Sequence, residues 1–280
     1  MPERFSAFSF VDRITELEPG KRARGRFWVP QSLAYFPSSL IAEAVGQLAA
    51  WVGMAQLEFR KRPVAGLAGE ARFLGKVRPG QTLDLAVAIE TCDDDAIAYD
   101  GSAQVDGALV LELERCVGPM LPIEDFDAAH AIRGHFELLR GSGAAAGRFP
   151  GTPEPDLSVV ERSSGQWLRA ELRVPESASF FRDHFPRRPV FPATLLLDAQ
   201  IRLALGLAAE TANWPAGAQA VPSRVTDVKM RAFILPGQVV EIRSEILSAT
   251  SEAATAAVTA RVAGKPVSTG RVEIVARGAA

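Results

Sequence analysis

The sequence predicts an α+β fold made of two similar units, each a long buried helix followed by antiparallel strands that wrap around it. Three observations support this. The chain of 280 residues repeats a set of short motifs at nearly constant spacing. Each copy contains a helix that is apolar nearly all round, and each continues with segments in which apolar and polar residues alternate. A length of this order suits one large domain or two of about 140 residues.

The repeat rests on three pairs of motifs that occur in the same order. "FPSSLIAEAVGQLAAWVG", from Phe36, resembles "FPATLLLDAQIRLALGLA", from Phe191, and this places Glu43 opposite Asp198 at an offset of 155. Pro-Gly-Gln at 79–81 recurs at 236–238, and "VDG" at 105–107 recurs as "VAG" at 262–264, both at an offset of 157. We therefore expect a duplicated unit of roughly 130 residues.

Each unit is expected to start with its buried helix. Pro37 and Pro192 would open these helices, with Ser38, Ser39 and Thr194 beside them, as is typical of a helix N-terminus. Alternating segments joined by Pro-Gly and Asp-Gly turns then predict strands. These segments are Thr82–Glu90, Ala108–Cys116, Val239–Leu247 and Ala254–Val262.

The domain organisation follows from the repeat. Residues 141–156 are rich in Gly, Ala and Pro, which indicates a surface linker. We predict an N-terminal unit at 1–140, the linker at 141–156, and a C-terminal unit at 157–280.

The composition excludes several classes of function. A net charge of -2 gives no field that would attract nucleic acid. Two cysteines do not suggest a disulfide scaffold, and together with three histidines they argue against a structural zinc site. The longest apolar run, 40–57, is interrupted by Glu43, Gly46 and Gln47, which favours a buried helix over a membrane span. We expect a cytoplasmic protein with no nucleic-acid partner.

The stretch "HFPRRPVFPATLLLDA", from His184, resembles the His-Phe-x-Gly-x-Pro-x-x-Pro-Gly…Asp/Glu-Ala motif of the FabA/FabZ-type (3R)-hydroxyacyl-acyl-carrier-protein dehydratases. "FSFVDRITELEPGKRARG", "ARFLGKVRPGQTLDLAV" and "VDGALVLE" resemble further segments of that family. The resemblance covers most of residues 8–120 and, more weakly, 165–277. It implies the hotdog fold, and with the repeat it implies a fused double hotdog. Arg187 and Ala193 stand where the family motif has glycine.

In that family the active site lies between two hotdogs, with a His from one and an acid from the facing helix of the other. The fourteen residues from His184 to Asp198 equal the family spacing of these two groups. The first unit has no histidine before His130, because ten residues are missing between Val29 and Pro37 relative to the second unit. The resemblance therefore implies a single complete site, made by His184 and Glu43.

The neighbours of the two acids support this choice. Glu43 has Gln47 four residues later, on the same helix face, whereas Asp198 has Arg202. A cation favours the ionised carboxylate and lowers its pKa, whereas a general acid near neutrality needs a raised pKa. We expect Asp198 and Arg202 to be a vestigial pair. Gln47 either orients Glu43 or only fills the interface.

The resemblance also implies a mechanism. His184 would remove the α-proton of a 3-hydroxyacyl thioester, and Glu43 would protonate the leaving hydroxyl. A helix N-terminus near Ala193 or Ser38–Ser39 would supply a backbone donor for the thioester oxygen. Gln47, Phe185, Pro192 and Ala193 are the expected substrate-binding residues. No metal or redox cofactor is expected, and the acyl group would be carried on phosphopantetheine of acyl carrier protein or coenzyme A.

Five basic residues and two histidines lie outside the predicted catalytic pair. The basic side chains could meet an acidic carrier protein, but solvated surface charge is the preferred hypothesis. They are Arg182, Arg187, Arg188, Lys61 and Arg62. His130 and His135 are expected in a connecting helix without a catalytic role.

Two other functions stay open on the sequence. One is an acyl thioesterase, which uses the same fold with an acid on the helix. The other is a hotdog that binds acyl chains or carrier protein without turnover. The internal pseudo-dimer also leaves a further homodimer open.

Overall fold

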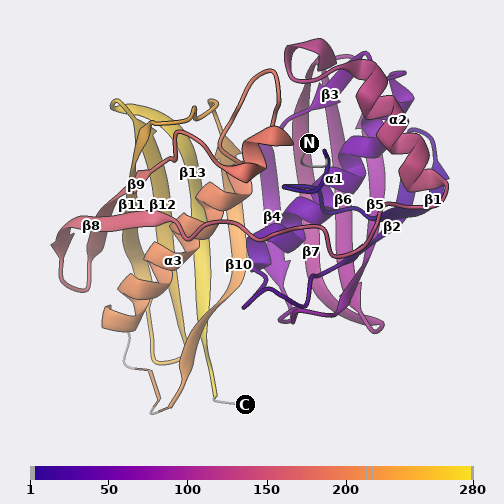
Figure 1. Cartoon of the computed structure of the whole chain (residues 1–280). Coiled ribbons are helices and arrows are strands. Elements are labelled where there is room, and N and C mark those ends of the chain that lie inside the picture. The colour runs from indigo at the N-terminus through magenta and orange to yellow at the C-terminus, as the bar shows by residue number, and fades with distance from the viewer. Residues whose placement is uncertain (1–3, 212–213, 216, 279–280) are drawn as a thin grey trace.

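The computed structural model describes residues 4–211, 214–215 and 217–278, and it contains one large antiparallel sheet with helices on one side (Figure 1). The elements of the first unit are β1 Arg13–Glu18, β2 Arg22–Trp28, α1 Ser38–Gln56, β3 Lys61–Pro63, β4 Leu67–Phe73, β5 Thr82–Cys92, β6 Ala96–Val105, β7 Ala108–Pro122, a 3-10 turn at Ile123–Asp125 and α2 Ala129–Arg140. Those of the second are β8 Asp156–Ser163, β9 Trp167–Arg173, a 3-10 turn at Ser179–Arg182, α3 Ala193–Thr211, β10 Gln219–Met230, β11 Val239–Ala249, β12 Ala253–Val262 and β13 Lys265–Arg277.

The strand order reads the same from both edges of the sheet. The order is β1-β2-β5-β6-β7-β4-β10-β13-β12-β11-β9-β8, with β3 added on β7. Each unit thus contributes the same antiparallel arrangement, and the two arrangements join where β4 pairs with β10. We call this β4–β10 pairing the seam. It follows that the duplicated sequence folds as two matching halves of one continuous sheet.

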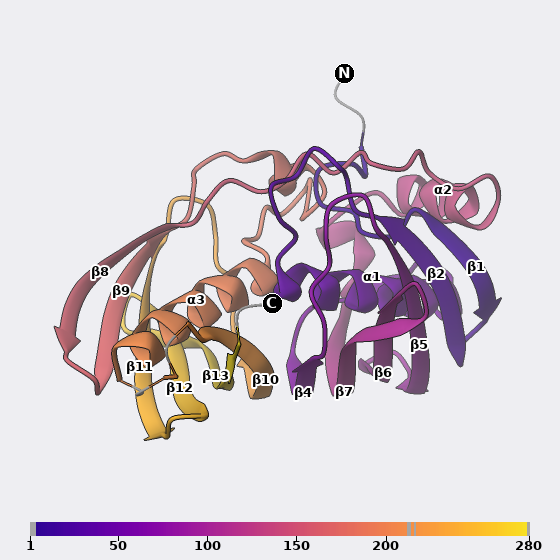
Figure 2. The same cartoon turned by 90° about the horizontal axis from the view of Figure 1, so that it is seen from below.

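The two long helices lie on the same concave side of the sheet, with their N-terminal ends near the seam (Figure 2). α1 is buried along most of its length. Its buried side chains include Leu40, Ile41, Val45 and Leu48. A helix surrounded by a curved sheet must be apolar on most sides, which explains why its sequence lacks a polar face. Both predicted helices and all four predicted strands are confirmed, with strand ends extended by up to six residues.

The connections that lead into these helices differ in length, as the gap in the repeat predicts. Residues 29–37 join β2 directly to α1, whereas residues 174–192 join β9 to α3 and include the 3-10 turn at Ser179–Arg182. Only the longer connection carries a histidine, His184. The extra residues therefore form a loop that reaches the N-terminal end of α3.

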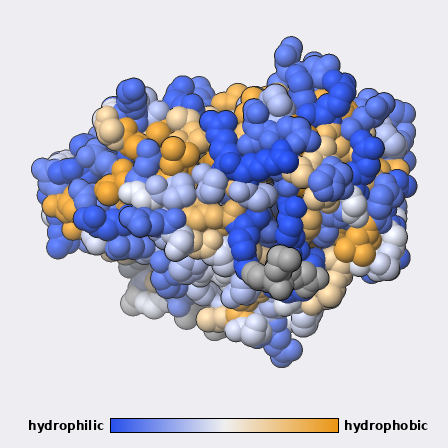
Figure 3. Space-filling view, turned by 45° about the horizontal axis from the view of Figure 1, so that its top comes forward, coloured by the Kyte–Doolittle hydropathy of each residue, from blue (hydrophilic) through white to orange (hydrophobic). Residues whose placement is uncertain are grey.

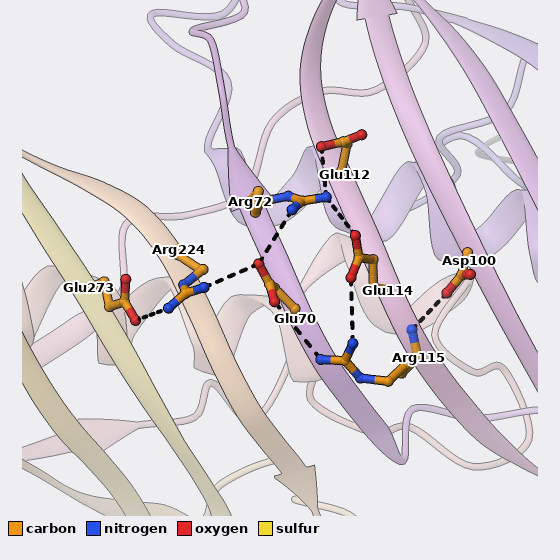
Figure 4. Close-up of polar contacts among 8 residues, drawn as sticks. All are labelled: Glu70, Arg72, Asp100, Glu112, Glu114, Arg115, Arg224 and Glu273. Carbon is orange, nitrogen blue, oxygen red and sulfur yellow. Dashed lines mark hydrogen bonds and ion pairs between the residues drawn. The ribbon is translucent and has the colours of Figure 1, made fainter.

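An ion-pair network crosses the outer face of the seam (Figure 4). Glu70 of β4 lies 3.5 Å from Arg224 of β10, and 3.8 Å from both Arg72 and Arg115. Arg224 also pairs with Glu273 of β13 at 2.5 Å. Charges from both units are thus connected through one carboxylate.

The surface seen in Figure 3 is mostly hydrophilic, with small separate hydrophobic patches. Across the part of the chain that the structure describes, no helix is both long and apolar enough to cross a membrane.

Candidate active site

Glu43 lies in the second turn of α1, and both of its carboxylate oxygens accept hydrogen bonds. Gln47 Nε2 donates to Oε1 at 2.9 Å, and Thr194 Oγ1 donates to Oε2 at 2.7 Å. Gln47 comes from the next turn of the same helix, whereas Thr194 comes from the first turn of α3 in the other unit. Of the two alternatives left open for Gln47, this hydrogen bond favours the one in which Gln47 orients Glu43. The two donors fix the orientation of the carboxylate.

Gln47 also ties down the N-terminal segment of the chain. Its Oε1 accepts a hydrogen bond from the backbone N–H of Phe10 at 2.8 Å, and its Nε2 donates to the carbonyl of Phe8 at 3.0 Å. A side-chain amide whose oxygen and nitrogen are both hydrogen-bonded cannot rotate by 180° without losing these bonds. Gln47 therefore holds both the Glu43 carboxylate and the N-terminal segment that contains Phe8 and Phe10.

His184 lies in the loop before α3, and its tautomer follows from one contact. Nδ1 lies 2.9 Å from the carbonyl oxygen of Val190. A carbonyl can only accept, so Nδ1 carries the proton and Nε2 of the neutral ring has a free lone pair. Burial lowers the pKa of His184 below its ordinary value of 6.5, although the nearby Glu43 carboxylate acts in the opposite direction. The ring is therefore neutral at pH 7 and can accept a proton at Nε2.

Asp183 holds residues 5–8 against the imidazole ring of His184. Its carboxylate accepts backbone N–H hydrogen bonds from Phe5 at 2.9 Å, Ala7 at 2.7 Å and Phe8 at 2.9 Å. The ring of Phe8 meets His184 edge to face, with ring centroids 5.5 Å apart. The N-terminal segment thus shields the histidine from solvent. Sequence reasoning missed this role of Asp183 and the contact made by Thr194.

One cavity of about 250 Å³ brings these groups together. Glu43 and Gln47 line it from the first unit, and His184, Phe185 and Ala193 line it from the second. Ala193 is the first residue of α3, where backbone N–H groups lack partners within the helix. Of the expected substrate-binding residues, Pro192 is not among those that line the cavity.

Arg62 lies inside this cavity, and the hypothesis that it is a solvated surface charge is wrong. Its guanidinium lies 3.8 Å from the ring centroid of Phe185. Burial lowers its pKa to about 10, with Asp127 and Glu43 acting in the opposite direction. Arg62 is the middle residue of β3, which pairs with the end of β7. Arg187, by contrast, is exposed and pairs with Glu124, as expected for a surface charge.

Asp198 and Arg202 form a separate polar cluster away from the cavity. Arg202 Nε binds Asp198 at 2.7 Å, and its Nη atoms bind Tyr35 and, at 3.0 Å, Glu154 of the segment between the two units. The expected ion pair is therefore present. The expected pKa is wrong, because burial raises the pKa of Asp198 above its ordinary value and outweighs Arg202, which lowers it.

The two other histidines lie in α2, as expected. His130 is exposed, whereas His135 is buried and stacks on Phe5 with ring centroids 4.0 Å apart. Neither lines the cavity. Within residues 4–211, 214–215 and 217–278, no cluster of three or more His, Cys, Asp or Glu side chains could hold a metal ion.

The fold and the cavity define a double-hotdog protein that presents a histidine and a carboxylate, one from each unit, to the same space. Solved structures support the fold. A putative oleoyl thioesterase from Lactobacillus plantarum superposes with a TM-score of 0.61 at 10% identity, covering 92% of this chain and 96% of that one. A MaoC-like dehydratase gives 0.54 at 13% identity, covering 93% and 98%. The predicted double-hotdog fold is confirmed.

Sequence comparisons identify the family. Residues 1–114 match the FabA-like domain, and residues 160–271 match the ApeI dehydratase domain of the ApeI-like family. The 3-hydroxyacyl-acyl-carrier-protein dehydratase FabZ of Bacillus velezensis is 38% identical over 126 residues, which cover 41% of this chain and 88% of that protein. Its counterpart in Bacillus subtilis is 37% identical with the same coverage. The chain therefore belongs to the FabA/FabZ-type dehydratase family, as its motifs indicate.

Proposed function

We propose that this chain removes water from 3-hydroxyacyl thioesters to give trans-2-enoyl thioesters, in a single active site between its two units. The observation that carries the proposal is the cavity shared by His184 and Glu43, one residue from each unit. Membership of the dehydratase family supports the reaction class. The substrate would be carried on phosphopantetheine of acyl carrier protein or of coenzyme A. The name of the FabZ relatives includes acyl carrier protein, which supports the first of these carriers.

In the proposed reaction His184 Nε2 accepts the α-proton, because Nδ1 already carries its proton toward Val190. The electron pair of the broken C–H bond forms the new α,β double bond as the β-hydroxyl leaves. Glu43, in its protonated form, gives its proton to that hydroxyl, so that water departs and a carboxylate remains. The proton then returns from His184 to Glu43 or solvent to restore both groups.

Negative charge on the thioester oxygen would be stabilised by the backbone N–H of Ala193. This group lies at the N-terminus of α3 and lines the cavity, and such N–H groups carry partial positive charge. An alanine donates there as well as glycine would, because only the side chain differs. Ser38–Ser39 are not needed for this role.

The test is hydration of crotonyl and longer trans-2-enoyl thioesters by the purified full chain. His184→Ala and Glu43→Gln should each lower kcat/KM by roughly 10²-fold or more, as expected for loss of a general acid or base. Asp198→Asn is the matched control, because this acid occupies the equivalent helix position outside the cavity and should leave the rate unchanged. Full activity of His184→Ala would overturn the proposal.

The same assay separates the alternatives. A thioesterase would release free thiol from acyl thioesters without hydrating the double bond. A binding protein would show neither reaction while still binding the thioester.

A further inference from the structure

The cavity contains a cation that the proposed reaction does not use. Arg62 enters the cavity from β3, and its guanidinium lies 3.8 Å from the ring centroid of Phe185. On the same phenyl ring stacks His184, with ring centroids 4.1 Å apart and ring planes 25° apart. Two groups stacked this closely on one ring occupy its opposite faces. Phe185 therefore separates the guanidinium from the imidazole, and no hydrogen bond joins the N–H groups of Arg62 to His184.

Those N–H groups have no acceptor among the described residues. Nε is buried without a hydrogen-bond partner. The two carboxylates whose charges reach Arg62 are already bound by other donors. Asp127 accepts two hydrogen bonds from Arg4, at 2.7 and 2.5 Å, and one from the N–H of Ala128.

Glu43, the other neighbour, accepts hydrogen bonds from Gln47 and Thr194, and among the described residues none joins it to Arg62. The pKa of Arg62, about 10, still leaves the guanidinium charged at neutral pH. Arg62 is half-buried, and a charged group that lines a cavity without hydrogen bonds from the protein can be matched there by a ligand. The missing acceptor is therefore expected to arrive with the substrate.

We propose that Arg62 recognises a carboxylate on the acyl part of the substrate. The planar fork of an arginine fits a carboxylate with two parallel hydrogen bonds. The phosphate of the pantetheine arm is the other anion of such substrates, but it lies at the far end of the arm from the thioester. The thioester must lie between His184 and Glu43 for the reaction, and Arg62 lines the same cavity. The proposal rests on the proposed function for the position of the thioester.

The remaining lining of the cavity is largely apolar, with Ala50, Met54, Ile97 and Leu113 among its residues. An apolar wall binds the methylene groups of any acyl chain and distinguishes poorly between them. A single cation in the wall of the cavity, in contrast, disfavours chains that leave it unpaired. Arg62 is thus placed to decide which acyl thioesters are used.

The experiment compares two matched thioesters with the full chain. One is the mono-coenzyme A thioester of trans-2-hexenedioic acid, which has a free carboxylate, and the other is its methyl ester. The wild type should hydrate the carboxylate form with a kcat/KM roughly 10- to 100-fold higher, the range of a charge-assisted hydrogen-bonded pair. Arg62→Met should abolish or reverse this ratio, and Arg62→Lys should keep only part of it.

Arg188→Met is the matched control. Arg188 is exposed and lies 4.7 Å over Phe233 in the adjoining aromatic cluster, but it does not line the cavity. Its loss removes the same charge nearby and should leave the ratio unchanged. Equal rates for the two thioesters in the wild type, or an equal loss for both in Arg62→Met, would overturn the proposal.

A binding measurement separates this inference from the proposed function. Calorimetry with adipoyl-coenzyme A and hexanoyl-coenzyme A, which cannot be hydrated, should show tighter binding of the former to the wild type but not to Arg62→Met. Should the wild type hydrate no enoyl thioester at all, the proposed function fails, and the calorimetric difference still decides the role of Arg62. Equal affinity for both ligands counts against a carboxylate site.

Discussion

Thr194 Oγ1 donates a 2.7 Å hydrogen bond to Oε2 of Glu43, so that the first turn of α3 holds a carboxylate of α1. The two residues are 151 positions apart in the chain. Ser39 occupies the position of α1 that matches Thr194 in α3, at the same offset of 155 that relates Glu43 to Asp198. The two helix N-termini are thus equivalent in sequence, but only one of them serves the cavity.

Replacing Thr194 by valine should lower kcat/KM for enoyl thioester hydration by roughly 10-fold or more, because a hydrogen bond to a charged group contributes about 1.5–3 kcal/mol. Valine keeps the shape of threonine and removes only the hydroxyl. Thr194→Ser should restore most of the activity. Ser39→Ala, which changes the equivalent position, should leave the rate unaltered. Similar losses in Thr194→Val and Ser39→Ala would indicate a general effect on helix packing instead.

The repeat in the sequence predicted the two helices and the longer connection that carries His184, and both are present in the structure. The role of Glu43 as the acid came from the family resemblance and stays a prediction. The repeat could not predict Thr194 as a donor, because that bond depends on how closely the two helix ends approach. Asp183 was missed because its partners, at residues 5–8, are more than 170 positions away. Arg62 was misplaced because a three-residue strand has too little periodicity to show which side chain faces inward.

The pKa of Asp198 shows a different limit of sequence reasoning. Arg202 was visible at four residues' distance, and its effect on the carboxylate has the expected sign. Burial, which the sequence does not quantify, acts more strongly in the opposite direction. The sequence could predict that Arg202 neighbours Asp198, whereas it could not predict how deeply the carboxylate is buried.

The pH dependence of dehydration should reflect the buried state of His184. Burial lowers its pKa below 6.5, and the proposed base is the neutral ring, so activity should persist as the pH falls below 6.5. The acid limb of kcat/KM, measured in the dehydration direction, should therefore lie below pH 6.5. Phe8→Ala would open the ring to water and should move this limb upward, whereas Phe8→Leu, which keeps the bulk, should move it less. A wild-type limb at or above pH 6.5 contradicts this account.

His135 should make the fold sensitive to acid. Burial is the largest of the effects that lower its pKa, to about 4, whereas the unfolded chain has a pKa near 6.5. Between these values the unfolded state binds a proton that the native state does not, so the free energy of unfolding falls as the pH drops from 6.5 to 4. His135→Phe keeps an aromatic ring on Phe5, and Nε2 of His135 has no partner to lose. Between pH 6.5 and 4 the free energy of unfolding of this variant should therefore fall by up to about 3 kcal/mol less than that of the wild type.

The measurement is urea unfolding of both proteins at several pH values between 4 and 7. Asp12 has a pKa raised by burial to about 6, so its contribution is lost as the pH rises from 3.8 to 6, which is the opposite sign. The difference between variant and wild type isolates His135, because Asp12 is present in both. Parallel curves for the two proteins would exclude the assigned effect.

Glu70 should stabilise the seam between the two units. Its side chain is only 13% exposed and lies among three arginines, of which Arg224 belongs to the other unit. Glu70→Gln keeps the shape but leaves these cations without their central anion, which should cost about 1–3 kcal/mol of unfolding free energy. Glu16→Gln is the matched control, because the Glu16–Arg24 pair, at 3.6 Å with both side chains 68% exposed, should contribute less than about 0.5 kcal/mol. If Glu70→Gln unfolds at the same urea concentration as Glu16→Gln, the backbone pairing of β4 with β10 and the packing beneath it suffice to hold the units together.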